Sequence, residues 1–310
     1  LRSKQTVVFG DELQYGAVGA VNVSKEYSSQ YFKDILDNYS KDKKDFIAED
    51  VKQKIIDDIS KVDSEDEMES SQTYVISPAT KEWLKTFSVR TSTLSFCKAI
   101  KNYSDSLNIH FRSYPEIIGY SNEFFYKESQ IPLIINRIRA KPIKDVLRFE
   151  KIETQGLAGQ NVNLDEIEFI KNELQDLYNS GTKLTIGVIC SFREQTARME
   201  EELRKYLNGY HDLVEKNKLS IWFVGDVQGE ERDIVYYSFV QDKKIGNADL
   251  RTIYPVVGGI ADNIRKLKKQ RLNVGFSRAK EQMVFVHSMP IEEYSDTVLG
   301  DALNFYNQTL

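Results

Sequence analysis

Two kinds of element meet at Gln270-Arg271-Leu272-Asn273-Val274-Gly275-Phe276-Ser277-Arg278-Ala279-Lys280, which leaves a basic helix and enters the apolar strand Met283-Val284-Phe285-Val286. Arginine and asparagine at a helix end, before a buried strand of a parallel sheet, predict fixed cations at the carboxyl edge of that sheet. Phosphate-bearing ligands bind at this edge in open α/β sheets. The alternative is a solvated basic helix that precedes a strand and binds nothing.

Strands and helices alternate regularly through the second half of the chain. Because βαβ units of this length favour parallel strands, the pattern predicts an α/β fold with a parallel sheet covered by helices on both faces. The pattern predicts strands at 146–152, 184–189, 219–224, 234–240 and 283–286, of which 184–189 is a continuous apolar run. The helical periodicity predicts helices at 164–178, 193–207, 263–272 and 297–306.

The composition limits the classes of function. The 310 residues carry a formal charge of −5, so no global basic field indicates a nucleic-acid binder. Cys97 and Cys190 lie far apart without a partner pattern, which favours a reducing compartment. Three scattered histidines argue against a metal site of protein nitrogen and sulfur ligands. No apolar run is long enough to span a bilayer, so we expect a cytoplasmic protein without a membrane partner.

One region differs in composition from the rest. Residues 25–69 hold fourteen acidic residues against eight lysines, and apolar residues within them recur at helical spacing. A second helical pattern runs from Trp83 to Ile100. We interpret residues 21–106 as a helical, partly acidic insertion or linker without chemistry of its own.

The stretch R-L-N-V-x-x-S-R-A-K, Arg271 to Lys280, resembles the last conserved motif of superfamily 1 helicases. The second arginine of that motif is the arginine finger that reaches the γ-phosphate of ATP. The resemblance therefore assigns Arg278 to catalysis and places Asn273 at the nucleotide. It also implies a RecA-like sheet of the P-loop NTPase helicase type.

A short strand at the start of the chain, Thr6 to Phe9, ends in Gly10-Asp11-Glu12-Leu13-Gln14. An apolar strand before Asp-Glu is the pattern of a magnesium-binding Walker B element. Gly-Asp-x-x-Gln instead resembles motif III of superfamily 1, in which Gln14 would sense the γ-phosphate. We favour the second interpretation because later motifs follow in family order. An ordinary strand-to-turn junction remains an alternative.

The run His110-Phe111-Arg112-Ser113-Tyr114-Pro115 precedes a proline-led helix. An aromatic ring beside an arginine suits base stacking and phosphate binding. The run and Ser121-Asn122-Glu123-Phe124-Phe125-Tyr126 resemble a further family pattern, which implies that Phe111 stacks on the base and Arg112 contacts the γ-phosphate. The alternative is an amphipathic helix start with aromatic core residues.

Two later segments extend the resemblance. Val224 to Val235 resembles a T-V-D-S-x-Q-G-x-E-x-D-x-V motif, in which Gln228 and Gly229 form the turn, Glu231 binds the ribose and Asp233 orients it. Phe223, Gly225 and Asp226 depart from it, and Asp226 places a carboxylate where the family offers a hydroxyl to the nucleic-acid backbone. Ile186 to Gln195 resembles a segment whose Ser191 would contact that backbone or, alternatively, cap a helix.

No phosphate-binding G-x-x-x-x-G-K-[ST] loop occurs in the sequence. The resemblance therefore implies a C-terminal portion of a longer superfamily 1 motor, closest to the nonsense-decay branch. Residues 1–20 would end the first RecA-like domain and residues 107–310 would form the second. We expect the chain alone to be inactive, because Mg²⁺ and the ATP phosphates would be held mainly by that first domain.

The activity implied is an ATP-dependent helicase that acts on single-stranded DNA or RNA, with the first RecA-like domain as its intramolecular partner. Two alternatives stay open. One is a regulatory ATPase that does not translocate, and the other is a nucleic-acid-associated scaffold module without activity.

Overall fold

The computed structural model describes residues 105–240, 262–294 and 297–309, together with Val8, Gly10, Asp11 and Asp34. The described residues from Ser106 onward belong to one compact unit. The predicted segments 1–20 and 21–106, with Gln14, lie almost wholly outside the described residues and stay predictions. In the part of the chain that is described, no helix has the length and apolar character needed to cross a bilayer.

Seven strands and six α-helices make up the described fold. The strands are β1 (Ile109–His110), β2 (Ile134–Ile135), β3 (Leu147–Lys151), β4 (Ile186–Cys190), β5 (Ser220–Phe223), β6 (Arg232–Ser238) and β7 (Ala279–His287). The α-helices are α5 (Pro115–Ser121), α6 (Leu164–Asn179), α7 (Arg193–Tyr206), α8 (Tyr210–Lys216), α10 (Asp262–Phe276) and α11 (Val298–Thr309). Shorter turns are the π-helix η1 (Asn122–Lys127) and the 3-10 helices η2 (Ile143–Asp145) and η3 (Ile291–Tyr294).

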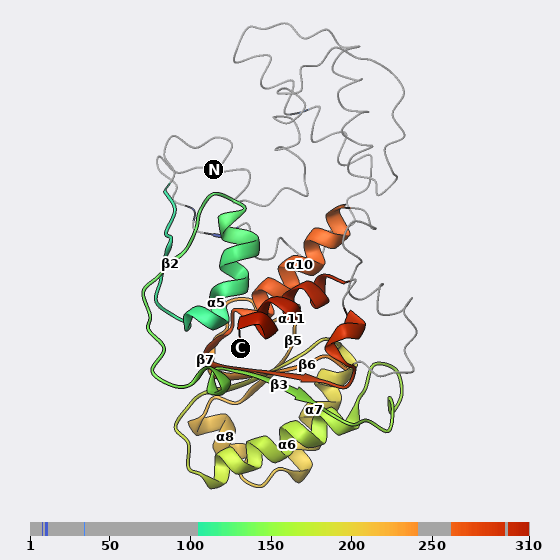
Figure 1. Ribbon diagram of the computed structural model, residues 1–310. Coiled ribbons are helices and arrows are strands. Elements are labelled where there is room, and N and C mark those ends of the chain that lie inside the picture. The colour runs from blue at the N-terminus through green and yellow to red at the C-terminus, as the bar shows by residue number, and fades with distance from the viewer. Residues whose placement is uncertain are drawn as a thin grey trace, which may run out of the picture. The chain divides into compact units, whose positions relative to one another are not determined.

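Five strands form one parallel sheet in the order β3-β7-β6-β4-β5. Helices α6, α7 and α8 lie on one face of this sheet and α5, α10 and α11 on the other (Figure 1). The α/β fold with a parallel sheet and helices on both faces is therefore confirmed. A separate parallel pair, β1 with β2, was not expected.

The two faces of the sheet carry two separate apolar cores. Because alternate residues of a strand point to opposite faces, Val235 and Tyr237 of β6 pack in one core while Ile234 and Tyr236 pack in the other. All five residues of β4 are buried, as a continuous apolar run in a parallel sheet predicts. The predicted core residue Phe125 is buried as well, with Phe124 and Tyr126 packed against the same core.

Helix α10 extends four residues further than the predicted end at 272, and β7 begins four residues before Met283. Gly275 lies in the extra turn of the helix. A Cβ atom there would come within 2.7 Å of the Tyr237 ring, so the glycine lets the helix approach the sheet closely. The basic stretch therefore forms one continuous helix, a two-residue turn and the start of the strand.

A buried carboxylate joins helix α6 to the carboxyl ends of two strands. Glu166 is fully buried, and its carboxylate accepts hydrogen bonds from the hydroxyl groups of Ser238 at 2.6 Å and Ser288 at 2.8 Å. It also accepts from the backbone N–H of Val240 at 3.0 Å. Val240 has a φ of 65°, a left-handed conformation that a β-branched residue rarely adopts, so this bond supports a strained position.

Two amide side chains fix the direction of these hydrogen bonds. Asn163 Nδ2 donates to Ser288 Oγ at 2.8 Å, and Gln195 Nε2 donates to Ser238 Oγ at 3.1 Å. Because each serine hydroxyl accepts from an amide, its own proton is directed to Glu166. Asn163 also caps α6 through its side-chain oxygen. The network thus has a donor for each carboxylate oxygen although no cation is paired with it in these contacts.

Replacement of Glu166 by glutamine should change how stability depends on pH. Burial raises the pKa of Glu166 from 4.5 to about 7. An acid whose pKa is raised by folding stabilises the fold most when protonated, so its contribution is present below about 4.5 and is lost as the pH rises through about 7. Over that interval the wild type should lose roughly 3 kcal/mol of unfolding free energy relative to Glu166→Gln.

Urea unfolding of both proteins at about pH 5 and about pH 7.5 measures this difference, and the comparison cancels the contribution of other titrating groups. Parallel pH profiles for the two proteins would contradict it.

Candidate functional site

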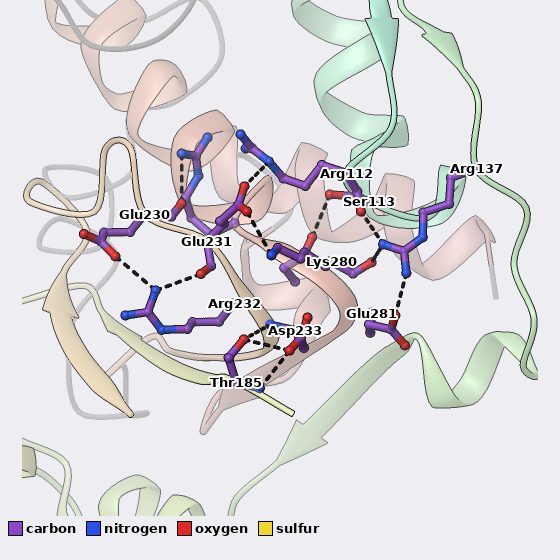
Figure 2. A network of polar contacts seen from close by, with 12 residues as sticks. Arg112, Ser113, Arg137, Thr185, Glu230, Glu231, Arg232, Asp233, Lys280 and Glu281 are labelled. Carbon is purple, nitrogen blue, oxygen red and sulfur yellow. Dashed lines mark hydrogen bonds and ion pairs between the residues drawn. The ribbon is translucent and has the colours of Figure 1, made fainter. Parts of the chain in front are cut away.

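Three segments meet at the amino edge of the main sheet. Arg112 precedes α5, Glu231 precedes β6, and Lys280 is the second residue of β7. Figure 2 shows these three side chains directed toward one another. Since β6 and β7 are parallel neighbours, their first residues lie side by side, and Arg232 N–H donates to the carbonyl of Arg278 at 3.1 Å.

The expected placement of the cations at the carboxyl edge is wrong. Arg278 and Lys280 lie where β7 begins, and all strands of the sheet are parallel. A residue immediately before a strand must lie at the amino edge, whatever helix precedes it. The rule for ligands at the carboxyl edge therefore does not apply to this stretch.

The Glu231 carboxylate joins cations from two distant parts of the chain. Its Oε2 lies 2.6 Å from Arg112 Nε, and its Oε1 lies 2.8 Å from Lys280 Nζ. The Lys280 hydrogen bond is the largest cause of a lowered pKa at Glu231, and the charges of Arg112 and Arg278 add to it against partial burial. Glu231 is therefore held as an anion among three cations.

Arg278, the predicted arginine finger, lies inside the fold with 2% of its surface exposed. Its Nε donates to the carbonyl of Val274 at 2.8 Å and its other nitrogens to Ser277 Oγ at 2.8 Å and the carbonyl of Glu230 at 3.3 Å. The guanidinium would have to leave these acceptors before it could contact a ligand. Its role in catalysis stays a prediction.

Phe111 and Asn273 differ in accessibility. The Phe111 side chain is 63% exposed beside Arg112, as a ring that stacks on a base must be. Asn273 is 2% exposed within α10, so its side chain faces the protein in this conformation. The nucleotide contacts predicted for both residues stay predictions.

The turn before Glu231 is formed by Gln228 and Gly229, as predicted. Gly229 has a φ of 88°, a backbone conformation that favours glycine. Steric crowding is not the reason, because nothing lies within 4 Å of a Cβ atom added there. Arg232 anchors this loop to β5: its guanidinium donates to the carbonyl of Glu231 at 2.8 Å and to Ser220 Oγ at 2.8 Å, and lies 4.8 Å from the Trp222 ring centre.

Asp233 does not orient Glu231, contrary to the prediction. Its Oδ2 accepts hydrogen bonds from the backbone N–H and the hydroxyl of Thr185, both at 2.8 Å (Figure 2). Asp233 therefore ties the start of β6 to the residue before β4. Alternation along a strand does not account for this, because Glu231 lies before β6 begins and the pairing of β6 with β7 shifts register between Arg232 and Ile234.

Sequence reasoning missed Lys280 and Arg232 as contributors to this site. Lys280 is the last residue of the helicase-like stretch Arg271 to Lys280, and its place in that motif could have identified it as a site residue. Arg232 carries no comparable pattern, because its partners come from the loop around Lys218 and from β5.

The opposite, carboxyl edge holds the residues predicted to contact nucleic acid. Ser191 follows β4, and its backbone N–H donates to the carbonyl of Ser238 at 3.1 Å. The alternative that Ser191 caps α7 is not supported, because Phe192 occupies the cap position and makes no side-chain cap hydrogen bond. Contact of Ser191 with nucleic acid stays a prediction.

Asp226, the carboxylate expected near the nucleic-acid backbone, is paired with an arginine in the structure. Its two carboxylate oxygens accept from Arg193 at 2.7 and 3.0 Å. The Arg193 guanidinium also lies 4.4 Å from the centre of the Phe223 ring. Since a Cβ atom at Gly225 would lie 2.4 Å from that ring, the departures at Phe223 and Gly225 are coupled.

Comparison with known families places the chain. The family described as an AAA domain matches residues 90–289, well over half of the sequence. The chain belongs to this AAA-domain family. It holds a superfamily 1 helicase-like C-terminal domain, as the resemblance implied.

Relatives of this AAA domain include named helicases. The chain is 24% identical to Helicase sen1 of Schizosaccharomyces pombe over 243 residues, 71% of this chain and 13% of the relative. It is 26% identical to the uncharacterized ATP-dependent helicase MG140 of Mycoplasma genitalium over 229 residues, 68% of this chain and 19% of the relative. A third relative is the 5'-3' DNA helicase ZGRF1 of Mus musculus, 23% identical over 192 residues, 59% of this chain and 9% of the relative.

The chain thus spans between 9% and 19% of the length of these relatives.

In the described part of the AAA domain, no group of three or more His, Cys, Asp or Glu side chains is placed to hold a metal ion. Glu231, the carboxylate at the amino edge, already forms ion pairs with the side chains of Arg112 and Lys280. We therefore assign no magnesium ligand to these residues.

Proposed function

We propose that residues 107–310 are the second RecA-like motor domain of an ATP-dependent superfamily 1 helicase and bind ATP at the amino edge of the sheet. The convergence of Arg112 and Lys280 on Glu231 carries this proposal. Arg278 adds a third positive charge next to them. A site with more cations than anions, bordered by the exposed Phe111 ring, suits a polyphosphate joined to a base.

An exchange of partners would accompany nucleotide binding. Ribose hydroxyl groups would donate to Glu231, and phosphate oxygens would accept from Arg112 in place of the carboxylate. The side chains of Arg112 and Glu231 are about two-fifths exposed, so their ion pair contributes little free energy and is readily exchanged. Glu231 thus holds the cation in place until a ligand arrives.

Arg278 would act later than Arg112. Its three protein acceptors hold the guanidinium inside the fold, and closure of a first RecA-like domain over ATP would draw it toward the departing γ-phosphoryl group. Cations fixed at that group stabilise its developing charge. ATP hydrolysis would then depend on domain closure and not on binding alone. Mg²⁺ would be held by the first domain, and the predicted inactivity of the chain alone follows.

We further propose that the carboxyl edge contacts single-stranded nucleic acid through Ser191, Arg193 and the loop at Asp226. Arg193 is exposed and its charge is offset by Asp226. The ion pair of Arg193 with Asp226 favours one of the two alternatives, a regulatory ATPase that binds single-stranded nucleic acid weakly and does not translocate. Strand affinity and ATP hydrolysis therefore need separate tests.

In the full-length protein, Arg278→Ala should lower kcat for ATP hydrolysis about 10³-fold and leave KM nearly unchanged, as expected for an arginine finger. Steady-state phosphate release measures both constants. Arg204→Ala provides a control for the loss of an arginine at the surface, because Arg204 pairs with Glu200 on the exposed face of α7. A change in KM alone would show that Arg278 binds ground state and transition state equally.

Asp226→Ser should tighten single-strand binding by about fivefold to tenfold at low salt, since it removes a negative charge and releases Arg193. Fluorescence anisotropy with a labelled oligonucleotide at two salt concentrations measures the gain, which should shrink at higher ionic strength. The gain should also shrink in an Arg193→Ala background. Unchanged or weaker binding by Asp226→Ser would place the strand elsewhere.

A further inference from the structure

A single guanidinium group bonds to the backbone of both cationic segments of the proposed nucleotide site. Arg137 lies two residues beyond β2, in the segment seen at the right of Figure 2. Its Nη1 donates to the carbonyl of Arg112 and, at 3.1 Å, to the carbonyl of Lys280. Arg112 and Lys280 are the two residues whose side chains bind Glu231.

The orientation of Arg137 is itself fixed from two further directions. Its Nη2 donates to Glu281 Oε1, and its guanidinium carbon lies 4.2 Å from the centre of the Tyr114 ring. Tyr114 adds a hydrogen bond of its own to the second Glu281 oxygen at 3.4 Å. The plane of the guanidinium is therefore set by an ion pair at one side and by a ring at its face.

The two segments that Arg137 joins also contact each other directly. Ser113 Oγ donates to the carbonyl of Ala279 at 2.7 Å, and Tyr114 N–H donates to the carbonyl of Lys280 at 3.3 Å. These bonds hold the residues after Arg112. Among the hydrogen bonds of the described residues, Arg137 is the donor that reaches Arg112 itself at its carbonyl oxygen.

We propose that Arg137 is a positioning residue, which sets the distance between Arg112 and Lys280 and so holds the phosphate-binding cations in register. This inference rests on the proposed nucleotide site. Arg137 acts through the backbone and does not touch the nucleotide. A displacement of about 1 Å at a reacting group can lower the rate by up to about a hundredfold. Loss of the hydrogen bonds from Arg137 to the two carbonyl groups should therefore affect catalysis more than stability.

Arginine is required because the task needs several donors in one plane. A lysine ammonium is a compact charge on a flexible stem and cannot keep the fixed fork of a guanidinium. Arg137→Lys therefore keeps the charge opposite Glu281 but leaves the Arg112 carbonyl without its fixed donor. Glu281 also has Lys141 at 3.6 Å, so its own charge stays compensated in that variant.

The chain offers a matched control two residues away. Arg139 lies on the same segment and its Nε pairs with Glu116 at 2.9 Å. Glu116 belongs to the first turn of α5, away from the carbonyl groups that Arg137 binds. Arg139→Lys thus makes the same chemical change in the same segment and keeps the hydrogen bonds from Arg137 to the carbonyl groups of Arg112 and Lys280.

The test compares steady-state ATP hydrolysis by the full-length protein and its variants. Arg137→Lys should lower kcat by about tenfold to a hundredfold and change KM less than about threefold, whereas Arg139→Lys should leave both nearly unchanged. In an Arg112→Ala background, Arg137→Lys should lower kcat by less than about threefold further, because residues that act as a unit are not additive. Thermal unfolding of each variant checks the fold.

The outcomes separate the two proposals. If Arg112→Ala leaves both KM and kcat unchanged, the proposed nucleotide site is wrong. If Arg112→Ala changes KM or kcat but Arg137→Lys has the same kinetics as Arg139→Lys, or if its effect on kcat is the same with and without Arg112→Ala, the positioning role is wrong and the site stands. Should Arg137→Lys fail to fold, Glu281→Gln gives a second test, since it loosens the guanidinium without removing it. An unchanged kcat in Glu281→Gln would contradict the proposal.

Discussion

The parallel pairing of β6 with β7 is the constraint on which the proposed site depends. It places the beginnings of both strands at one edge, so that Glu231 and Lys280 face each other although they lie 49 positions apart in the sequence. The third partner, Arg112, reaches this edge because Ser113 and Tyr114 bond to the backbone at the beginning of β7. No single ion pair at this surface is strong, since partly exposed pairs contribute about 1 kcal/mol or less. Their common location, set by the sheet, is what makes them a candidate nucleotide site.

The fold was predictable where one residue pattern spans a whole element. Four strands of the main sheet contain an apolar run, β3 alternates apolar with charged residues, and each long helix has a periodic apolar face, so those elements were found within a few residues. The short elements were not: β1 and β2 are two residues each and depend on a partner 25 positions away. Helix α8 begins after Gly209, whose left-handed conformation ends the preceding segment, and Leu213 is the buried residue among its seven. Contacts between distant segments decide such elements.

Several residues of the candidate site were expected from the sequence, but their location and contacts were not. The stretch Arg271 to Lys280 contains Arg278 and Lys280, which lie near Glu231 in the structure, yet the edge of the sheet was inferred from a rule about strand ends that applies to residues after a strand. Asp233 was misassigned, and the partner of Asp226 was not foreseen, for one physical reason. Each is a carboxylate whose partner, Arg193 or Thr185, lies more than thirty residues away, and sequence spacing gives no information on such pairs. Arg137 is missed likewise, because one arginine in a polar segment has no pattern.

The most direct test of the account is photolabelling of the full-length protein with 8-azido-ATP, followed by mapping of the labelled peptides by mass spectrometry. A base bound at the amino edge lies beside the exposed Phe111 ring, so the label is expected on the peptide that contains Phe111 and Arg112, and excess ATP should abolish it. Within residues 107–310, label confined to the carboxyl edge, on peptides that contain Ser191 or Phe223, would contradict the account.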